Sequence, residues 1–188
     1  MKYVFITGIP TAGKSYLAKK ISEKTGCLHI DIDKWREEMA KDPKLERWVN
    51  FYWNVDEEKY LLEKTCDERW SDLTKQSETF WPTIENKIKE IVKSNKPAIF
   101  EGVNVLPHLA IKSFDFPGFC ILGNSFEEIF ERNKQSPRWG NTEKLQRMEA
   151  KDFFNCERLK YKAEAEKFGF KVYEDPNDAE EEILTILQ

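Results

Sequence analysis

Short runs of apolar, β-branched and aromatic residues alternate along the chain with longer segments of helical spacing. Runs of strand length lie at 2–7, 27–32, 97–101, 116–122 and 170–173. Helical patterns cover 13–24, a segment that begins at Ser125, 141–168 as one or two helices, and 178–187. Strands that alternate with helices favour parallel pairing through right-handed crossovers. The pattern therefore predicts an α/β sandwich with a sheet between two helical layers.

The segment 34–96 departs from this alternation, because it is mostly helical, charged and rich in aromatic residues. It is too long for a simple crossover, so we expect a helical subdomain over one end of the sheet, inside a single domain spanning 1–188. Its aromatic side chains are expected mainly to form the core of that subdomain. The alternative is an aromatic binding surface, for which Trp35 and Trp53 are the first candidates.

Net charge and the positions of the cysteines disfavour a nucleic-acid-binding protein, a membrane protein and a zinc site. Thirty basic and 34 acidic residues give a net charge of −4, which offers no general attraction to nucleic acid or to an anionic membrane. No run has the form of a signal peptide or the length of a membrane span, so a cytoplasmic protein without a membrane partner is expected. The four cysteines are scattered without a C-x-x-C pair. This scatter disfavours a zinc site and predicts buried, reduced thiols.

The segment from Gly8 to Ser15, G-I-P-T-A-G-K-S, matches the phosphate-binding pattern G-x-x-x-x-G-K-[ST] at every position. It follows a predicted strand and opens a predicted helix, which is the context that this pattern requires. Glycines let successive backbone N–H groups point into one concavity, where they hold a phosphate. Lysine faces the β- and γ-phosphates and the serine hydroxyl ligates Mg²⁺. We therefore predict binding of ATP with Mg²⁺; the expected nucleotide contacts are Gly8, Ile9, Pro10, Thr11, Ala12, Gly13, Lys14, Ser15 and Tyr16.

Three carboxylates follow predicted strands that neighbour this loop. Asp31 and Asp33 are two residues apart at the end of one strand, so they share a face, and Glu101 ends another. We assign Asp33 to the hydroxyl of a phosphoryl acceptor, and Asp31 and Glu101, together with Ser15, to the metal. The alternatives are a helix cap at Asp33 with a solvated partner and, at Glu101, an ordinary carboxylate at a strand end.

Arginines complete the predicted site. Arg36 lies one helical turn after Asp33 and is a candidate for a phosphate or carboxylate of the acceptor; a solvated surface position is equally compatible with the pattern. Pro137 and Gly140 interrupt the helical pattern, which predicts a short lid over 133–141. Arg138 in this lid is the candidate for the charge that develops during transfer, beside Lys14, and Arg132 is the candidate for the nucleotide base. Exposed cations are the alternative for both.

With these residues placed, the chain resembles the small P-loop kinases of the adenylate/shikimate kinase type along nearly its whole length. This resemblance implies a five-stranded parallel sheet in the order 2-3-1-4-5, an acceptor-binding helical insert and a lid. D-K-W-R at 33–36 is similar to the D-x-x-R of polynucleotide 5′-kinases and zeta-toxin-like proteins, where the aspartate is the general base. E-G-V-N-V-L-P at 101–107 is similar to a motif of 2-phosphoglycerate kinase. The lid has fewer arginines than nucleoside monophosphate kinases have.

The function predicted from these features is ATP-dependent phosphorylation of a hydroxyl on a small metabolite, nucleoside or sugar-like compound. A 5′-hydroxyl kinase acting on nucleic-acid ends is a second hypothesis, which the acidic net charge disfavours. A third is a nucleotide-gated regulatory ATPase without a small-molecule acceptor. The motif residues do not distinguish among acceptors.

Overall fold

The computed structural model describes residues 2–187. The central sheet has five parallel strands in the order β2-β3-β1-β4-β5. The strands are β1 (Tyr3–Gly8), β2 (Leu28–Asp31), β3 (Ala98–Glu101), β4 (Gly118–Ile121) and β5 (Lys171–Tyr173). Both the α/β class and the strand order predicted above are confirmed.

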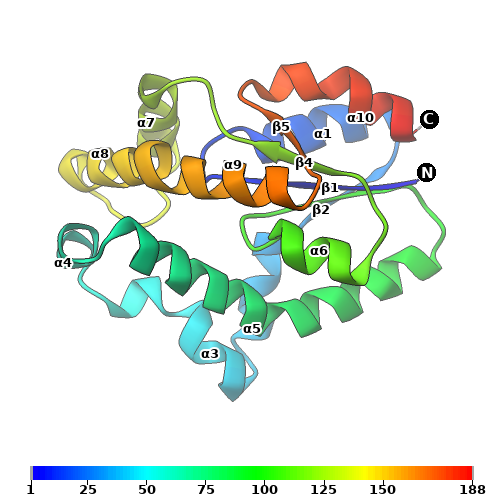
Figure 1. The fold of residues 1–188 in the computed structure, drawn as a ribbon. Coiled ribbons are helices and arrows are strands. Elements are labelled where there is room, and N and C mark those ends of the chain that lie inside the picture. Colours follow the sequence, from blue (N-terminus) through cyan, green and yellow to red (C-terminus); the bar gives the residue numbers. More distant parts are fainter. Residues whose placement is uncertain (1, 188) are drawn as a thin grey trace.

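Helices cover both faces of this sheet and form a three-layer sandwich, as Figure 1 shows. The layer on one face consists of α1 (Lys14–Thr25) and α10 (Glu180–Leu187), and that on the other contains α5 (Cys66–Lys93), α6 (Pro107–Ser113) and α9 (Arg158–Lys167). The central strand β1 is buried over five of its six residues, since it has a neighbour on each side and helices on each face. Such a strand gives the loop that follows it a rigid base.

The segment between β2 and β3 is helical, as predicted, but its last helix does more than build a subdomain. The elements before that helix are η1 (Ile32–Trp35), α2 (Arg36–Met39), α3 (Pro43–Val49), η2 (Tyr52–Asn54) and α4 (Glu57–Glu63). A capping box between Thr65 and Glu68 starts the 28-residue helix α5, which Figure 1 shows crossing the full width of the molecule. Its second half buries Ile84 and Ile88 in the main core. The insert is therefore anchored to the sheet by its own last helix.

The segment predicted to form a lid joins α7 (Phe126–Gln135) to α8 (Glu143–Asp152). Helix α7 continues to Gln135, so the first residues of the predicted lid are helical and the irregular part begins at Ser136. The predicted helical pattern over 141–168 is split by a π-helical turn, η3 (Phe153–Glu157). The last predicted helix begins instead with a 3₁₀ turn, η4 (Pro176–Ala179), capped by Asp175 rather than by Asp178.

The cysteines depart from the expectation of four reduced thiols. Cys66, at the start of α5, forms a disulfide with Cys156 in the π-helical turn, 90 residues further along the chain. Cys27 and Cys120 are free and buried, as predicted. Spacing along the chain gave no signal of this pair, because only the packing of α5 against η3 brings the two together. Within residues 2–187, no helix combines the length and the apolar character needed to cross a membrane.

Candidate active site

The loop after β1, which carries the predicted phosphate-binding motif, has a tightly curled backbone. Gly8, Thr11 and Gly13 have positive φ values of 126°, 59° and 98°, which curl the chain between the strand and α1. A Cβ on Gly8 would lie 1.9 Å from the carbonyl oxygen of Ile121 in β4, so only glycine fits there. Gly8 therefore allows the loop to approach β4 closely, and Thr11 and Gly13 adopt the left-handed backbone that curls it.

Lys14 opens α1 and folds back over this loop. Its Nζ donates a hydrogen bond to the carbonyl oxygen of Ile9 at 2.7 Å, and the side chain is buried. Burial lowers the pKa of Lys14, while the nearby Glu101 and Asp33 carboxylates act in the opposite direction. The ammonium group thus lies inside the loop with two acidic neighbours.

A cavity of about 190 Å³ opens over the loop and Lys14. Ser15 and Tyr16 line it from the exposed side of α1, and Arg132 reaches it from α7. The Arg132 Nη1 donates to the carbonyl oxygen of Thr11 at 3.2 Å, and Nη2 lies 3.2 Å from the Glu128 carboxylate. Of the predicted nucleotide contacts, Ile9 and Ala12 are buried and do not line the cavity, whereas Pro10, Thr11 and Gly13 do.

The predicted carboxylates meet at the carboxyl ends of β2 and β3, but they differ in position. Glu101 is 1% exposed, lines the cavity, and its Oε1 lies 3.1 Å from Nε2 of His29. Asp33 also lines the cavity, and its Oδ1 is buried without a partner among residues 2–187. Two of the three predicted carboxylates therefore face the cavity.

Asp31, the third predicted carboxylate, does not line this cavity. Its Oδ1 accepts a hydrogen bond from the backbone N–H of Asp33 at 3.1 Å and caps η1, and its Oδ2 lies 3.3 Å from Nζ of Lys34. Burial, then the charges of Glu101 and Asp33, raise the pKa of Asp31. The cap of this turn is thus Asp31 rather than Asp33, which leaves the Asp33 carboxylate available to the cavity.

The connection between α7 and α8, predicted to be a lid, places Arg138 near Asp33. Nη2 of Arg138 lies 3.5 Å from Oδ2 of Asp33, and Arg138 lines the cavity over the loop. Arg147, the next arginine along the chain, lies 4.4 Å over the ring of Phe130 instead and does not line this cavity. Of these two arginines, the structure brings only Arg138 to the site.

A buried network fixes Arg36 at the side of a second cavity. Its Nη2 donates to Oδ1 of Asn104 at 2.7 Å. The Asn104 amide in turn donates to Oε1 of Gln76 at 3.1 Å and to Oγ of Ser77 at 2.9 Å. Nε of Arg36 is buried without a partner among residues 2–187. Arg36 is therefore held in place and keeps unused hydrogen-bonding capacity.

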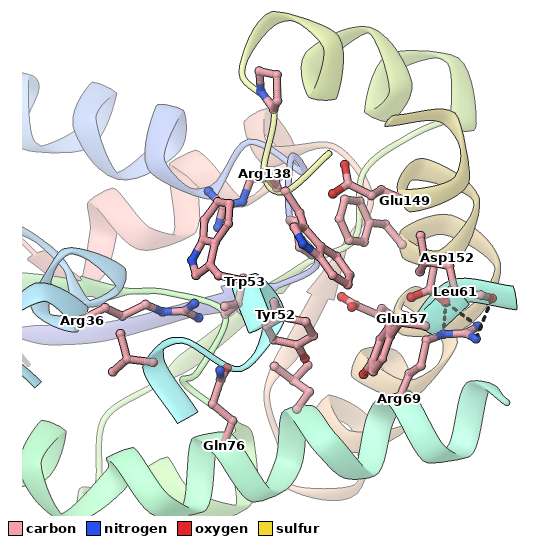
Figure 2. Close-up of a pocket in the computed structure, with 18 of the residues that line it drawn as sticks. Arg36, Tyr52, Trp53, Leu61, Arg69, Gln76, Arg138, Glu149, Asp152 and Glu157 are labelled. Atoms are coloured by element: carbon pink, nitrogen blue, oxygen red, sulfur yellow. Dashed lines mark hydrogen bonds and ion pairs between the residues drawn. The ribbon is translucent and has the colours of Figure 1, made fainter. Parts of the chain in front are cut away.

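This second cavity, of about 210 Å³, lies between the insert, the lid and α8, and Figure 2 shows its lining. Pro10, Ser136 and Arg138 line both cavities, so the two adjoin. Trp139 of the lid packs edge-on against Tyr52 and Tyr60 of the insert, with ring centroids 5.4 and 5.6 Å apart. Lid and insert thus meet through aromatic contacts above the second cavity.

The aromatic residues of the insert divide into two groups. Tyr52, Tyr60 and Trp53 line the second cavity, and Trp53 is 65% exposed. Phe80 and Trp81 are buried in the core, and Trp35 packs against that core without lining a cavity. The insert therefore supplies both a core and a cavity wall, and of the two candidates singled out above only Trp53 faces the cavity.

Sequence reasoning missed several residues of this second cavity. Asn104 lies inside the E-G-V-N motif, yet its contact with Arg36 crosses 68 residues of chain. Asn104 does not line the cavity itself, whereas Arg69, Asp152 and Glu157 do, and these three come from α5, α8 and η3. Nothing in the local sequence distinguishes them from surface charges on amphipathic helices.

Comparison with solved structures supports the fold. No family model matches the sequence, and no curated protein matches it. Among solved structures, shikimate kinase from Acinetobacter baumannii in complex with shikimate aligns over 100% of this chain and 93% of its own, with 13% identity and a TM-score of 0.56. Deoxyadenosine kinase from M. mycoides with bound dATP aligns over 98% of both chains, with 17% identity and a TM-score of 0.52. The chain therefore has the fold of the small P-loop kinases of the adenylate/shikimate kinase-like group.

Proposed function

We propose that the protein is an ATP-dependent kinase that transfers a γ-phosphoryl group to a hydroxyl of a small molecule. The observation that carries the proposal is the pair of adjoining cavities, one over the phosphate-binding loop and one under the lid, with Arg138 in the walls of both. Asp33 lies in the first cavity, 3.5 Å from Arg138. A phosphate donor and an acceptor hydroxyl would meet at this junction.

The cavity over the loop fits a nucleotide phosphate chain with Mg²⁺. Backbone N–H groups of the loop, the N-terminus of α1 and Lys14 supply the positive side of the site. We assign Ser15 and Glu101 to the hydrated metal, because both line the cavity and Mg²⁺ commonly takes few protein ligands beside substrate phosphates. Asp31 would act on the metal only through its charge. When bound, Mg²⁺ neutralises charge on the phosphates.

Asp33 is the proposed general base. Its buried Oδ1 has no partner among residues 2–187, so it can accept the proton of the acceptor hydroxyl. The acceptor oxygen then forms a bond to the γ-phosphorus, the bond from that phosphorus to the β–γ bridging oxygen breaks, and ADP leaves with the electron pair. The adjacent Gly102 keeps this position open, since a Cβ there would lie 3.1 Å from Oδ1 of Asp33.

Three arginines have distinct proposed roles. Arg138 faces the charge that spreads over the transferred phosphoryl group, because it lies where the two cavities join. Arg36 binds an electronegative group of the acceptor with its unused N–H groups. Arg132, fixed against the loop, contacts the nucleotide, beside Tyr16.

The test is ADP formation by the purified protein with ATP and Mg²⁺, measured without an acceptor and with a panel of small alcohols, nucleosides and sugars. We expect at least one compound to accelerate ADP formation and to yield a phosphate monoester, and Lys14→Ala to abolish both. Equal ADP formation with every compound and with none would contradict the proposal and favour a regulatory ATPase. Phosphorylation of oligonucleotide 5′ ends alone would favour the polynucleotide kinase.

A further inference from the structure

We propose that the acceptor is a hydroxyl compound with a cationic nitrogen, such as an amino alcohol, and that Glu157 and the aromatic wall of the second cavity bind this nitrogen. The inference deepens the proposed function, on which it rests. Figure 2 shows Arg36 on one side of the cavity, Glu157 with Asp152 and Arg69 on the other, and Tyr52 and Trp53 between them.

Two of the three carboxylates on this wall already have partners. Asp152 is paired with Arg69, whose Nη2 and Nε lie 2.7 and 2.9 Å from its Oδ1. Glu149 accepts from the backbone N–H of Gly140 at 3.0 Å and from Nδ2 of Asn133 at 2.6 Å. These two carboxylates stabilise the protein itself and have little capacity left for a ligand.

Glu157 is different. It is half-buried in the cavity wall, and within residues 2–187 its carboxyl group forms no side-chain hydrogen bond or ion pair. Burial and the neighbouring Asp152 charge raise the pKa of Glu157 to about 8. A carboxyl group placed in this way favours a ligand that supplies positive charge, because an ammonium group would offset both the burial and the repulsion from Asp152. The π-helical turn that presents Glu157 is a feature often found at functional sites.

Within residues 2–187 the arginines near the cavity form no hydrogen bond or ion pair with Glu157, although the charges of Arg69 and Arg138 lower its pKa and so partly oppose the effect of burial. Arg69 is occupied by Asp152 and by the carbonyl oxygens of Leu61 and Lys64. Arg138 faces Asp33 at the phosphate end. An anionic group of a ligand therefore has Arg36 as its partner on the far side, and the end of the cavity at Glu157 carries one unmatched carboxyl group.

The aromatic side chains of the second cavity also suit a cationic nitrogen of the acceptor. Tyr52, Tyr60 and Trp139 form a cluster with centroid separations of 5.4 to 5.8 Å, and Trp53 lines the cavity beside them. Aromatic faces attract desolvated cations through their quadrupoles, most strongly for tryptophan. Since Lys64 already lies 5.0 Å over the ring of Tyr60, a ligand nitrogen bound to Glu157 would contact the rings of Tyr52 and Trp53.

The test compares two matched sets of compounds that differ mainly in charge. One set is 2-amino-1-phenylethanol, 1-phenylethane-1,2-diol and mandelate; the other is glucosamine, glucose and glucuronate. Binding to the ADP- and Mg²⁺-loaded protein is measured by calorimetry or tryptophan fluorescence, and ADP formation from ATP is measured separately. The variants are Glu157→Gln, which keeps size and hydrogen bonding without charge, and Glu166→Gln as a control on the exposed side of α9.

We expect the cationic member of at least one set to bind about tenfold or more tightly than its neutral partner, and Glu157→Gln to remove that preference while Glu166→Gln keeps it. A preference for the neutral or anionic member, an unchanged preference in Glu157→Gln, or no binding of any of the six compounds would overturn the inference. Glu157-dependent binding of amines without ADP formation would uphold the subsite and contradict the kinase. ADP formation with neutral or anionic alcohols alone would support the kinase and contradict the amine subsite.

Discussion

Nη2 of Arg138 lies 3.5 Å from Oδ2 of Asp33, so the lid arginine and the proposed general base form an ion pair where the two cavities join. The pair leaves Oδ1 of Asp33 free and holds the lid over the loop. Arg138 is thereby kept close to the place where the phosphoryl group would transfer.

Replacing Arg138 by alanine should lower kcat about 10²- to 10³-fold, because a positioned donor to the transition-state charge is lost. ADP affinity should change little, since Lys14 and the loop are untouched. Arg147→Ala is the matched control, because Arg147 stacks over Phe130 away from both cavities. Equal loss of rate in the two variants would contradict the role of Arg138.

The loop geometry predicts different costs for alanine at two glycines with positive φ. Gly8→Ala places a Cβ 1.9 Å from the Ile121 carbonyl oxygen, whereas Gly26→Ala has strained backbone but nothing within 4 Å. We expect a loss of unfolding free energy of about 3 kcal/mol or more for the first and about 1–2 kcal/mol for the second. Urea denaturation measures both, and ADP binding should survive only in Gly26→Ala. Similar losses would argue against the close approach of β1 and β4.

The disulfide between Cys66 and Cys156 should stabilise the contact between α5 and η3, one side of the second cavity. Its reduction is expected to lower the free energy of unfolding by about 2–4 kcal/mol. A peptide map without reductant should contain the cross-linked pair, and Cys66→Ser with Cys156→Ser should be as unstable as the reduced protein and insensitive to dithiothreitol. A map with only free thiols would contradict this pairing.

The site shows which parts of the structure local sequence encodes. The G-x-x-x-x-G-K-[ST] motif predicts Lys14, and Glu101 is predicted because it ends a strand and parallel strands bring their carboxyl ends together. Arg138 was predicted because Pro137 and Gly140 interrupt a helix. In these cases a few neighbouring residues determine the strand or helix and the residue at which it ends. The topology of the backbone then brings the side chain to the cavity.

Apart from Arg36, Trp53 and Arg138, the sequence does not predict the residues of the second cavity, because they come from elements that are distant in sequence. Asn104 contacts Arg36 across 68 residues, and Cys66 meets Cys156 across 90. Glu157 faces inward because a π-helical turn shifts the side-chain register inside one helical pattern. Helical spacing fixes which residues share a face, but it does not fix which face meets the insert.

A pair of carboxyl groups at the base of the lid predicts a dependence of stability on pH. Burial and the adjacent Glu149 raise the pKa of Glu57 to about 7, well above its usual value. Between pH 4.5 and 7 the folded protein therefore holds a proton that the unfolded chain has lost, so this group makes stability fall as pH rises through that range. Glu57→Gln should show a smaller fall than wild type in urea denaturation at pH 5.5 and 8, while the more exposed Glu58→Gln should follow wild type. A wild-type dependence in Glu57→Gln would contradict the assignment.

The most direct test of the kinase proposal compares wild type with Asp33→Asn, using γ-labelled ATP and an acceptor identified by the panel. Asparagine keeps the size of the side chain but cannot take the proton of the hydroxyl. We predict loss of labelled phosphate monoester by at least about 10²-fold, with an ADP dissociation constant within about twofold of wild type. Transfer at the wild-type rate in Asp33→Asn would contradict the account.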